Sequence, residues 1–406
     1  MSQVNVKSKI ASTFLGIEGT FGTLPSTMYR SFPVAGTIEL GHSQTEIENE
    51  TESTKLYDRK NTVRGLKGGS VKFDMYPRST LVAYSGSNTP AENYQQQLLK
   101  AVFGGHQTST GSVVTTGAAS TTSVPVDNVS YFSRGQFALF TTTGGLEPAM
   151  VISSSATALT VSPALTSAPA SASVVANMDN FYPTDLNSYT LAFQRAFVDS
   201  SDMQWTYKGC KVNGFDLKIE RDKAIVCSVE LEAKDWVSGS QSIATTYATE
   251  SLAAPFAAVG VSCSLQATSV STRTHYPLES VAFKVTPGLV FLEELGGVQG
   301  ATGVMRTSDR TFAEATVKFR ADSQADFNWN AQTDMQLHVM VPKVDANGVR
   351  RWIIASMPTC QIVGTPKWSD ADGRLICEVV LKSKLNSLVS GPSSELSYAT
   401  FILATG

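Results

Sequence analysis

The strongest constraint on the fold of this chain is an internal repeat, because residues 205–234 recur near the end of the chain as residues 355–384. Cys210 matches Cys360 and Cys227 matches Cys377, and both pairs have the same offset of 150 residues. The chain has only five cysteines, so two matches at one offset argue against coincidence. A period of this length is too long for a solenoid and predicts two similar domains.

Each copy of the repeat has the sequence pattern of a long β-hairpin. Apolar residues alternate with other residues along 225–234, which is the period of a strand with one buried face, and the second copy keeps this phase. Arg-Asp-Lys at 221–223 and Asp-Gly at 372–373 fit a tight turn between the two runs. The residues predicted to form the buried face are Cys210, Cys227, Val229, Leu231, Cys360, Cys377, Val379 and Leu381.

The other face of the repeated strand carries charged side chains. Ile376 and Val380 make this face less polar in the second copy than in the first. Its charged residues are Glu230, Glu232, Lys234, Glu378, Lys382 and Lys384.

The repeat extends upstream with less regular spacing. Residues 70–73 resemble 316–319 and residues 189–193 resemble 335–339, at offsets of 246 and 146, so the first copy contains a large insertion. We therefore expect a mainly β protein with two tandem β-sandwich domains and a small inserted β domain. The expected first sandwich is 1–105 with 181–240, the insertion 106–180, a linker 241–275 and the second sandwich 276–406.

A helix is expected to flank each sandwich. Thr89, Pro90 and Glu92 form a helix-start pattern with a capping box, and Gly104 ends the apolar face that follows. The second copy is expected to carry a shorter helix near 325–329, and residues 248–259 of the linker could form another.

The insertion has the pattern of a small β domain. Short runs separated by Gly, Pro, Ser and Thr predict a barrel or sandwich that projects from the main body. The predicted strands are 123–126, 136–140, 149–152, 158–161 and 173–176.

Composition limits the class of partner. The 406 residues have a net charge of −3, which argues against non-specific binding to nucleic acid or to acidic membranes. The start of the sequence lacks the apolar core of a signal peptide and no later stretch reaches transmembrane length, so we expect synthesis in a cytoplasm and no membrane partner. In that setting the cysteines are expected to be small buried residues rather than disulfides.

A charged segment follows the first strands. Glu46, Glu48, Glu50 and Glu52 alternate, which fits either an acidic lining that repels polyanions or a solvated loop, and both interpretations remain. Basic residues come next, with few aromatic residues among them, which favours contact between subunits over nucleic-acid binding. They include Lys55, Arg59 and Arg64.

No pattern for catalysis emerges. The four histidines are isolated, and the chain lacks a nucleophile elbow, a P-loop and a dinucleotide fingerprint. The glycine-rich run 296–303 has no lysine, and Asp370-Ala-Asp-Gly lacks the later glutamate of a calcium loop. We expect no catalytic residue, metal or cofactor, and a function in assembly.

At this point the chain resembles the tail tube (major tail) proteins of phages with long non-contractile tails. The resemblance rests on Glu18-Gly-Thr-Phe-Gly22-Thr-Leu-Pro25, on the charged segment 46–67, on Gly69-Ser-Val-Lys-Phe73, on the single clear helix and on the hairpin that ends at Ala233. It implies β-sandwich tube domains that form six-domain rings around a DNA channel, with three two-domain subunits imitating six-fold symmetry.

The resemblance implies partners and a location. They are copies of the chain itself, the tape measure, terminator and baseplate proteins, and genomic DNA in transit, all within a virion tail. The charged face of the repeated strands becomes the candidate lumen lining and segment 46–64 the candidate contact between rings, although the polar face could equally point outward. The second copy departs from the pattern, since it has a shorter expected helix and no comparable acidic series.

Two other functions stay open from sequence. A terminator or baseplate hub would form one ring and stop. A glycan hydrolase could draw paired carboxylates from distant strands.

Overall fold

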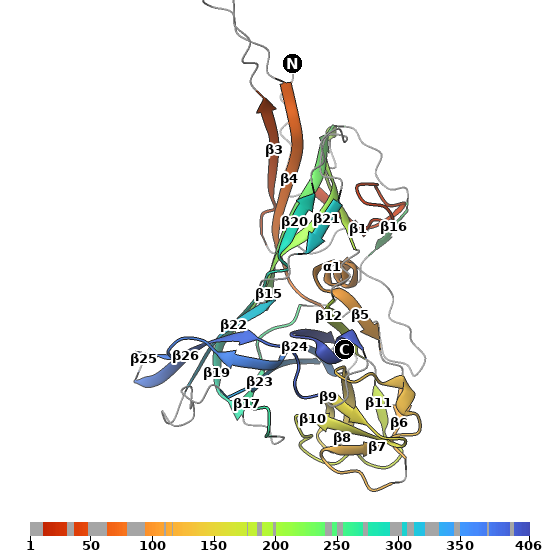
Figure 1. Cartoon of the computed structure of the whole chain (residues 1–406), viewed down its shortest axis with the longest axis vertical. Coiled ribbons are helices and arrows are strands. Elements are labelled where there is room, and N and C mark those ends of the chain that lie inside the picture. Colours follow the sequence, from red (N-terminus) through yellow and green to blue (C-terminus); the bar gives the residue numbers. More distant parts are fainter. Residues whose placement is uncertain are drawn as a thin grey trace, which may run out of the picture.

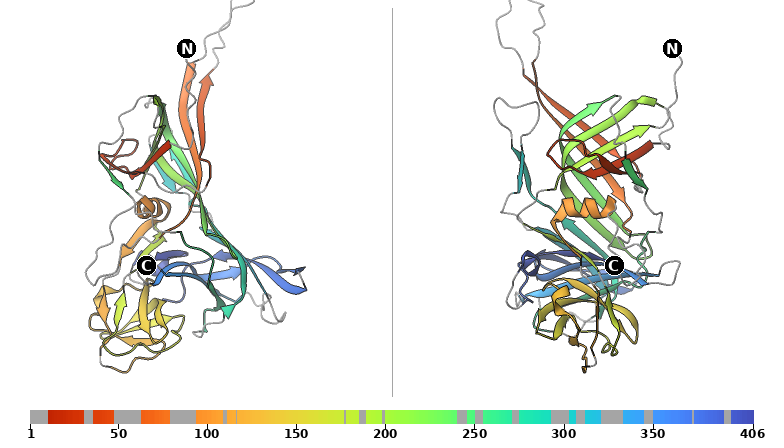
Figure 2. Two further views of the ribbon diagram at one scale, coloured as in Figure 1. Left: turned by 180° about the vertical axis from the view of Figure 1, so that it is seen from behind. Right: turned by 90° about the vertical axis from the view of Figure 1, so that its right-hand side faces the viewer.

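The protein is mainly β, as expected from the sequence. The computed structural model of the chain is shown in Figure 1 and, from two further sides, in Figure 2. The structure describes residues 11–30, 36–47, 63–78, 94–108, 111–115, 117–176, 178–184, 189–197, 200–239, 246–249, 255–270, 275–292, 303–306, 312–320, 333–344, 350–371, 373–389 and 394–406.

The internal repeat comprises a set of strands that pair in the same order in both copies. In the first copy the order is β1 (Ala11–Ile17), β13 (Leu191–Phe197), β14 (Ser200–Glu220), β15 (Val226–Ser238), β4 (Val63–Met75) and β3 (Glu39–Ile47). In the second it is β17 (Ser262–Ala267), β23 (Met335–Val344), β24 (Arg350–Ile362), β26 (Arg374–Ser383), β22 (Ala313–Arg320) and β19 (Leu278–Val285). Every pair in both series is antiparallel.

The register of the repeated hairpin agrees with the offset read from the sequence. Cys210 pairs with Ala233, and Cys360 pairs with Ser383. Both residues of the second pair lie 150 positions after the corresponding residues of the first. The next two pairs of the first copy, Lys211 with Glu232 and Val212 with Leu231, also have their equivalents 150 residues later in the second copy. Farther along, Cys227 pairs with Leu217 and Cys377 pairs with Trp368, so the offset of the partner rises to 151.

The upstream matches are displaced by two residues. Val71 pairs with Leu231, but the residue that pairs with Leu381 is Ala315, not the Val317 that the sequence match predicts. Likewise Leu191 pairs with Cys210, whereas Met335 pairs with Cys360, so the offset is 144 instead of 146. A strand repeats its facing every two residues, so the sequence match chose the correct face in the wrong register.

The hairpin of the second copy is interrupted. In the first copy β14 runs continuously past one irregularity between Val212 and Gly214. In the second copy residues 363–366 separate β24 from β25 (Lys367–Ala371), and Gly364 has a φ of +75°. Strand β25 then pairs with β26 up to Ala371 and Arg374.

The two copies share one extended sheet, which we call the ribbon. It contains β3, β4, β15, β14, β19, β22, β26 and β25, in that order of pairing. Each copy supplies four of these strands, and β14 and β19 join the two halves. Strand β14 has β15 on one edge. Along its other edge, residues 200–210 pair with β13 and residues 215–220 pair with β19. Strand β14 therefore passes from the sheet layer that contains β13 into the layer that contains β19.

One apolar core lies under the ribbon and continues across both copies. Helix α1 (Tyr94–Phe103) packs on it, and its last residue, Phe103, contacts the rings of Phe215, Phe312 and Phe401. Gly104 follows with a φ of +85°, as the expected helix end requires. The expected start of this helix and the expected helix near 325–329 lie outside the described residues.

The insertion folds as a separate six-stranded sheet with its own core. All five strands predicted within it are present. Figure 1 shows it at the opposite end of the long axis from β3 and β4. Its elements are β6 (Ser112–Val113), β7 (Ser123–Pro125), the 3-10 turn η2 (Val129–Tyr131), β8 (Phe137–Thr142), β9 (Gly145–Ser154), β10 (Ala158–Ser162) and β11 (Val174–Ala176).

A two-stranded stem attaches the insertion to the main body. Strand β5 (Gly104–Thr108) pairs with β12 (Asp179–Pro183), and β12 also pairs with the C-terminal strand β27 (Ile402–Thr405), which continues onto β24. A separate apolar cluster joins Phe137 and Met150 of the insertion to Trp352 and Ile354 of the second copy. The insertion is therefore packed against the second copy. The 3-10 turn η5 (Glu395–Tyr398) contributes Leu396 to this cluster.

The expected linker contains strands. Strand β17 pairs with β23 as β1 pairs with β13, so the second copy begins before residue 276. The sequence of β17 does not have the alternation of a half-buried strand, because its polar residues Ser264 and Gln266 are buried as well as its apolar ones. Of the segment 248–259, where a helix was considered, residues 248 and 249 belong to β16 (Thr246–Thr249), which pairs in parallel with β2 (Thr27–Arg30), and residues 255–259 are not helical. Residues 250–254 lie outside the described residues. The remaining strands are β18 (His275–Tyr276), β20 (Leu289–Leu292) and β21 (Gly303–Arg306).

Candidate functional site

Both copies of the repeat contribute strands to the polar face of the ribbon. The eight residues assigned to the buried face of the repeat are all buried, none being more than 2% exposed. Between them on β15, Glu230 and Glu232 are exposed, and Glu378 and Lys382 are partly exposed on β26. The ribbon therefore has one side packed on the core and one charged side.

Charges of opposite sign alternate across neighbouring strands of this face. In the first copy Lys72 lies between Glu39 and Glu230 on the adjacent strands. A second row crosses the joint in register as Asp216, Lys284, Glu314 and Lys382, whereas Glu230 itself is paired with Gly214. Cross-strand pairs of opposite charge stabilise a sheet by about 0.2–1 kcal/mol each, so this row supports the pairing of the two copies.

Three ion pairs connect neighbouring strands of the second copy on this face. Lys318 Nζ lies 2.9 Å from a carboxylate oxygen of Glu378, and Lys382 Nζ lies 3.1 Å from one of Glu314. Lys367 Nζ approaches the other oxygen of Glu378 at 3.6 Å. The hydrogen bond from Lys318 lowers the pKa of Glu378 below its usual value.

Two carboxylates on the polar face of the first copy have raised pKa values instead. Burial raises the pKa of Glu232, and the neighbouring Glu230 adds to the effect. Burial also raises the pKa of Asp216, although Lys284 acts against it. The two halves of the polar face therefore differ in electrostatics despite their common strand order.

Lys234 and Lys384 do not belong to the charged row. The ammonium group of Lys234 lies over the ring of Phe21, 4.7 Å from its centroid. Lys384 follows the end of β26 and forms an ion pair of 2.8 Å with Asp334. The alternation of the sequence continues through both lysines. Lys234 lies with Glu230 and Glu232 in the lining of one groove, whereas Lys384 lies beyond the end of β26.

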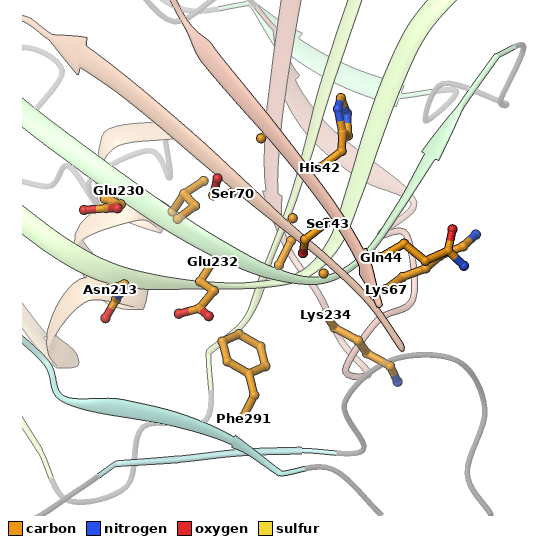
Figure 3. Close-up of a pocket in the computed structure, with 15 residues that line it drawn as sticks. His42, Ser43, Gln44, Lys67, Ser70, Asn213, Glu230, Glu232, Lys234 and Phe291 are labelled. Atoms are coloured by element: carbon orange, nitrogen blue, oxygen red, sulfur yellow. The ribbon is translucent and has the colours of Figure 1, made fainter. Parts of the chain in front are cut away.

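An open groove lies on the polar face of the first copy (Figure 3). The β20–β21 hairpin, which belongs to the second copy, stands opposite β15 and contributes Phe291 to it. Figure 3 shows Phe291 and Glu232 pointing toward one another. The second copy thus partly covers the charged face of the first. The polar residues of the lining include Ser43, Lys67, Ser70, Glu230, Glu232 and Lys234.

Only part of the charged segment 46–64 can be placed. Glu46 and Arg64 are paired residues of β3 and β4, close to where the described part of this strand pair ends. Glu48, Glu50, Glu52, Lys55 and Arg59 lie outside the described residues. Three residues after Arg64 on β4, the ammonium group of Lys67 lies 5.7 Å from the centroid of the Trp236 ring.

The buried carboxylate of Glu18, the first residue of the motif 18–25, connects separate segments of the first copy. Glu18 is 6% exposed and accepts hydrogen bonds of 2.8 Å from the backbone N–H of Gly22, the backbone N–H of Gly209 and the hydroxyl of Thr190. Burial raises its pKa, and these hydrogen bonds oppose that effect. Gly209 has a φ of +62°, so Glu18 fixes an unusual backbone conformation in β14.

The histidines have structural partners. His42 shares a hydrogen bond of 2.8 Å with the Tyr207 hydroxyl, and His106 Nε2 lies 3.1 Å from a carboxylate oxygen of Asp179 in the stem. His338 is buried between Ser356 and Gln336, with a hydrogen bond of 2.9 Å to each.

The cysteines are unbridged and buried. Among the residues that the structure describes, no three His, Cys, Asp or Glu side chains are arranged as a metal site. In the same part of the chain, no helix is both long and apolar enough to cross a membrane.

Comparison with known proteins adds no family. No protein-family model matches this chain, and no curated protein matches it.

Proposed function

We propose that this chain is a structural protein that assembles head to tail into closed rings, and that stacked rings form the tail tube of a phage with a long non-contractile tail. The observation that carries the proposal is the ribbon. Each copy of the repeat contributes the same four strands to it, and the two blocks are joined edge to edge within one chain. A chain built in this way can be extended by further copies of itself.

Ring closure would remove the two edges at the ends of the ribbon. Among the described strands, β3 has β4 as its one neighbour and β25 has β26. Exposed strand edges are sites for pairing with another chain, and a closed barrel has none. Contact between two different surfaces closes into a ring when the rotation per subunit allows it. Three chains would supply the six blocks of the ring that the resemblance implies.

The polar face would line the channel of such a ring. It lies on the side of the ribbon away from α1 and the core, which would form the wall. Its lysines at 318 and 382 are already paired with carboxylates. DNA is held by lysines and arginines that replace its counterions, so a surface of neutralised pairs would let it slide. Glu230, Glu232, Glu378 and Lys382 are the proposed lumen residues.

Stacking of rings would involve the β3–β4 hairpin. Figure 1 and Figure 2 show it extending beyond the rest of the described chain, away from the insertion. Within the virion the partners of the tube would be the tape measure, terminator and baseplate proteins, with DNA in transit.

Electron microscopy of the purified protein tests this function. We expect tubes of stacked rings when the protein is concentrated. Single rings that never stack would contradict the tube and favour a terminator or hub. Release of reducing ends from cell-wall or capsular glycans would instead indicate a glycan-degrading tail enzyme.

A further inference from the structure

The joint between the two copies contains a complete example of edge-to-edge pairing. Strands β14 and β19 pair in antiparallel register over six residues of each, including Leu217 with Phe283 and Lys218 with Ala282. Leu217 is 1% exposed and Phe283 is 0% exposed. The joint therefore buries three apolar pairs on the core side of the ribbon, and in the middle pair a leucine lies directly opposite an aromatic ring. The outer pairs are Phe215 with Val285 and Ile219 with Val281.

The two open edges of the ribbon are the counterparts of this joint. Trp368 pairs with Cys377 as Leu217 pairs with Cys227, so Trp368 of β25 corresponds to Leu217 of β14. Leu40 pairs with Val71 as Phe283 pairs with Ala315, so Leu40 of β3 corresponds to Phe283 of β19. The open edges thus also carry one aromatic residue and one leucine. The aromatic residue lies on β25, the equivalent of β14, and the leucine lies on β3, the equivalent of β19.

We propose that β25 of one chain pairs in antiparallel register with β3 of a second copy of the chain, with Trp368 opposite Leu40. The same register places Ser369 opposite Glu39 and Lys367 opposite Gly41. The contact repeats the internal joint between subunits. It deepens the proposed assembly by assigning its interface, but it requires only ring formation and not stacking.

Burial supports this pairing. Trp368 and Leu40 are partly buried against the core in the single chain, whereas their counterparts in the internal joint are fully buried. Pairing would cover the remaining apolar surface of both side chains, and each Å² removed from water contributes about 25 cal/mol.

Charge supports it as well. Lys367 is 79% exposed and Glu39 is exposed on the same face. In the proposed register they lie diagonally across the interface, which is within reach of long side chains. The contact would join two short rows of alternating charge, which are Lys318, Glu378 and Lys367 of one chain and Glu39, Lys72 and Glu230 of the next. Asp370 stands where the internal joint has the buried Ile219, so the pairing is expected to end at Ser369 and Glu39.

A designed disulfide tests the register. Glu39→Cys and Ser369→Cys are combined in the full chain, whose native cysteines are all buried. Directly opposed residues on antiparallel strands have Cα atoms about 4.5–5.5 Å apart, which suits a disulfide. After oxidation we expect most chains to run as inter-chain oligomers on a non-reducing gel and as single chains after reduction. Neither single variant should form oligomers beyond dimers.

Two further variants act as controls. Lys218→Cys with Ala282→Cys places the same pair in the internal joint and should close within one chain, which shows that the geometry permits the bond. Ser43→Cys with Ser369→Cys is out of register and should not link.

The outcomes separate this inference from the tube. Linked single rings would support the interface and contradict the tube, whereas tubes without the link would overturn the interface alone. Linking by the out-of-register pair would overturn the proposed pairing. A protein that stays monomeric at every concentration would overturn both.

Discussion

Protein carrying Val229→Asp is expected to be recovered unfolded or aggregated. Val229 is 1% exposed and lies on β15 between Phe73 of β4 and Phe215 of β14. An ionised carboxylate there would have no partner for its charge, and burying such a group costs several kcal/mol even after its pKa shifts. Since a domain is stable by about 5–15 kcal/mol, this single change removes most of that margin. Circular dichroism and gel filtration measure the loss.

The neighbouring residue supplies the control. Glu230→Asp changes an exposed side chain on the same strand and should leave the melting temperature nearly unchanged. Val379→Asp, at the equivalent position of the second copy, should behave like Val229→Asp because Val379 is 0% exposed. Normal folding of either buried variant would show that the facing of the repeated strand is wrong.

Glu18→Ala is expected to have the second largest effect. It leaves the backbone N–H groups of Gly22 and Gly209 and the hydroxyl of Thr190 without their acceptor. Each buried donor left unpaired costs about 1–3 kcal/mol, so we expect the free energy of unfolding to fall by about 3 kcal/mol or more. Urea unfolding followed by tryptophan fluorescence reports the change, since Trp205 and Trp236 lie on the adjacent hairpin.

Glu18→Gln separates hydrogen bonding from packing. The glutamine has nearly the same volume and keeps one oxygen acceptor, and it is neutral, so it avoids the desolvation that raises the pKa of Glu18. We expect it to retain more than half of the stability that Glu18→Ala loses. Equal losses in both variants would mean that Glu18 does not act through these hydrogen bonds.

The repeat was predictable because rare residues mark its register. Cysteines recur at one offset in both strands of the hairpin, so the equivalent positions of the two copies and their buried face could be predicted there. The upstream matches rested on alternation, which cannot distinguish a shift of two residues. Val71 and Ala315 became equivalent only when the partners Leu231 and Leu381 were known.

Other parts of the fold depend on contacts between distant segments. Strand β17 has buried polar residues between its apolar ones, so its alternation is hidden in the sequence. The role of Glu18 could not be predicted, because its hydrogen-bond donors Gly22, Thr190 and Gly209 lie in three separate parts of the sequence. The glycines close to Glu18 are the one local hint of a close backbone approach. The correspondence between the open edges at Trp368 and Leu40 follows from pairing partners, which no sequence pattern states.

The mass of the smallest closed assembly tests the central claim most directly. If each chain supplies two equivalent blocks of a six-block ring, native mass spectrometry should find a species of three chains, each of 43.4 kDa. End-on images of it should show three-fold symmetry with six similar lobes. A closed ring of six chains would contradict the account, because the two copies within one chain would then not be equivalent parts of the ring.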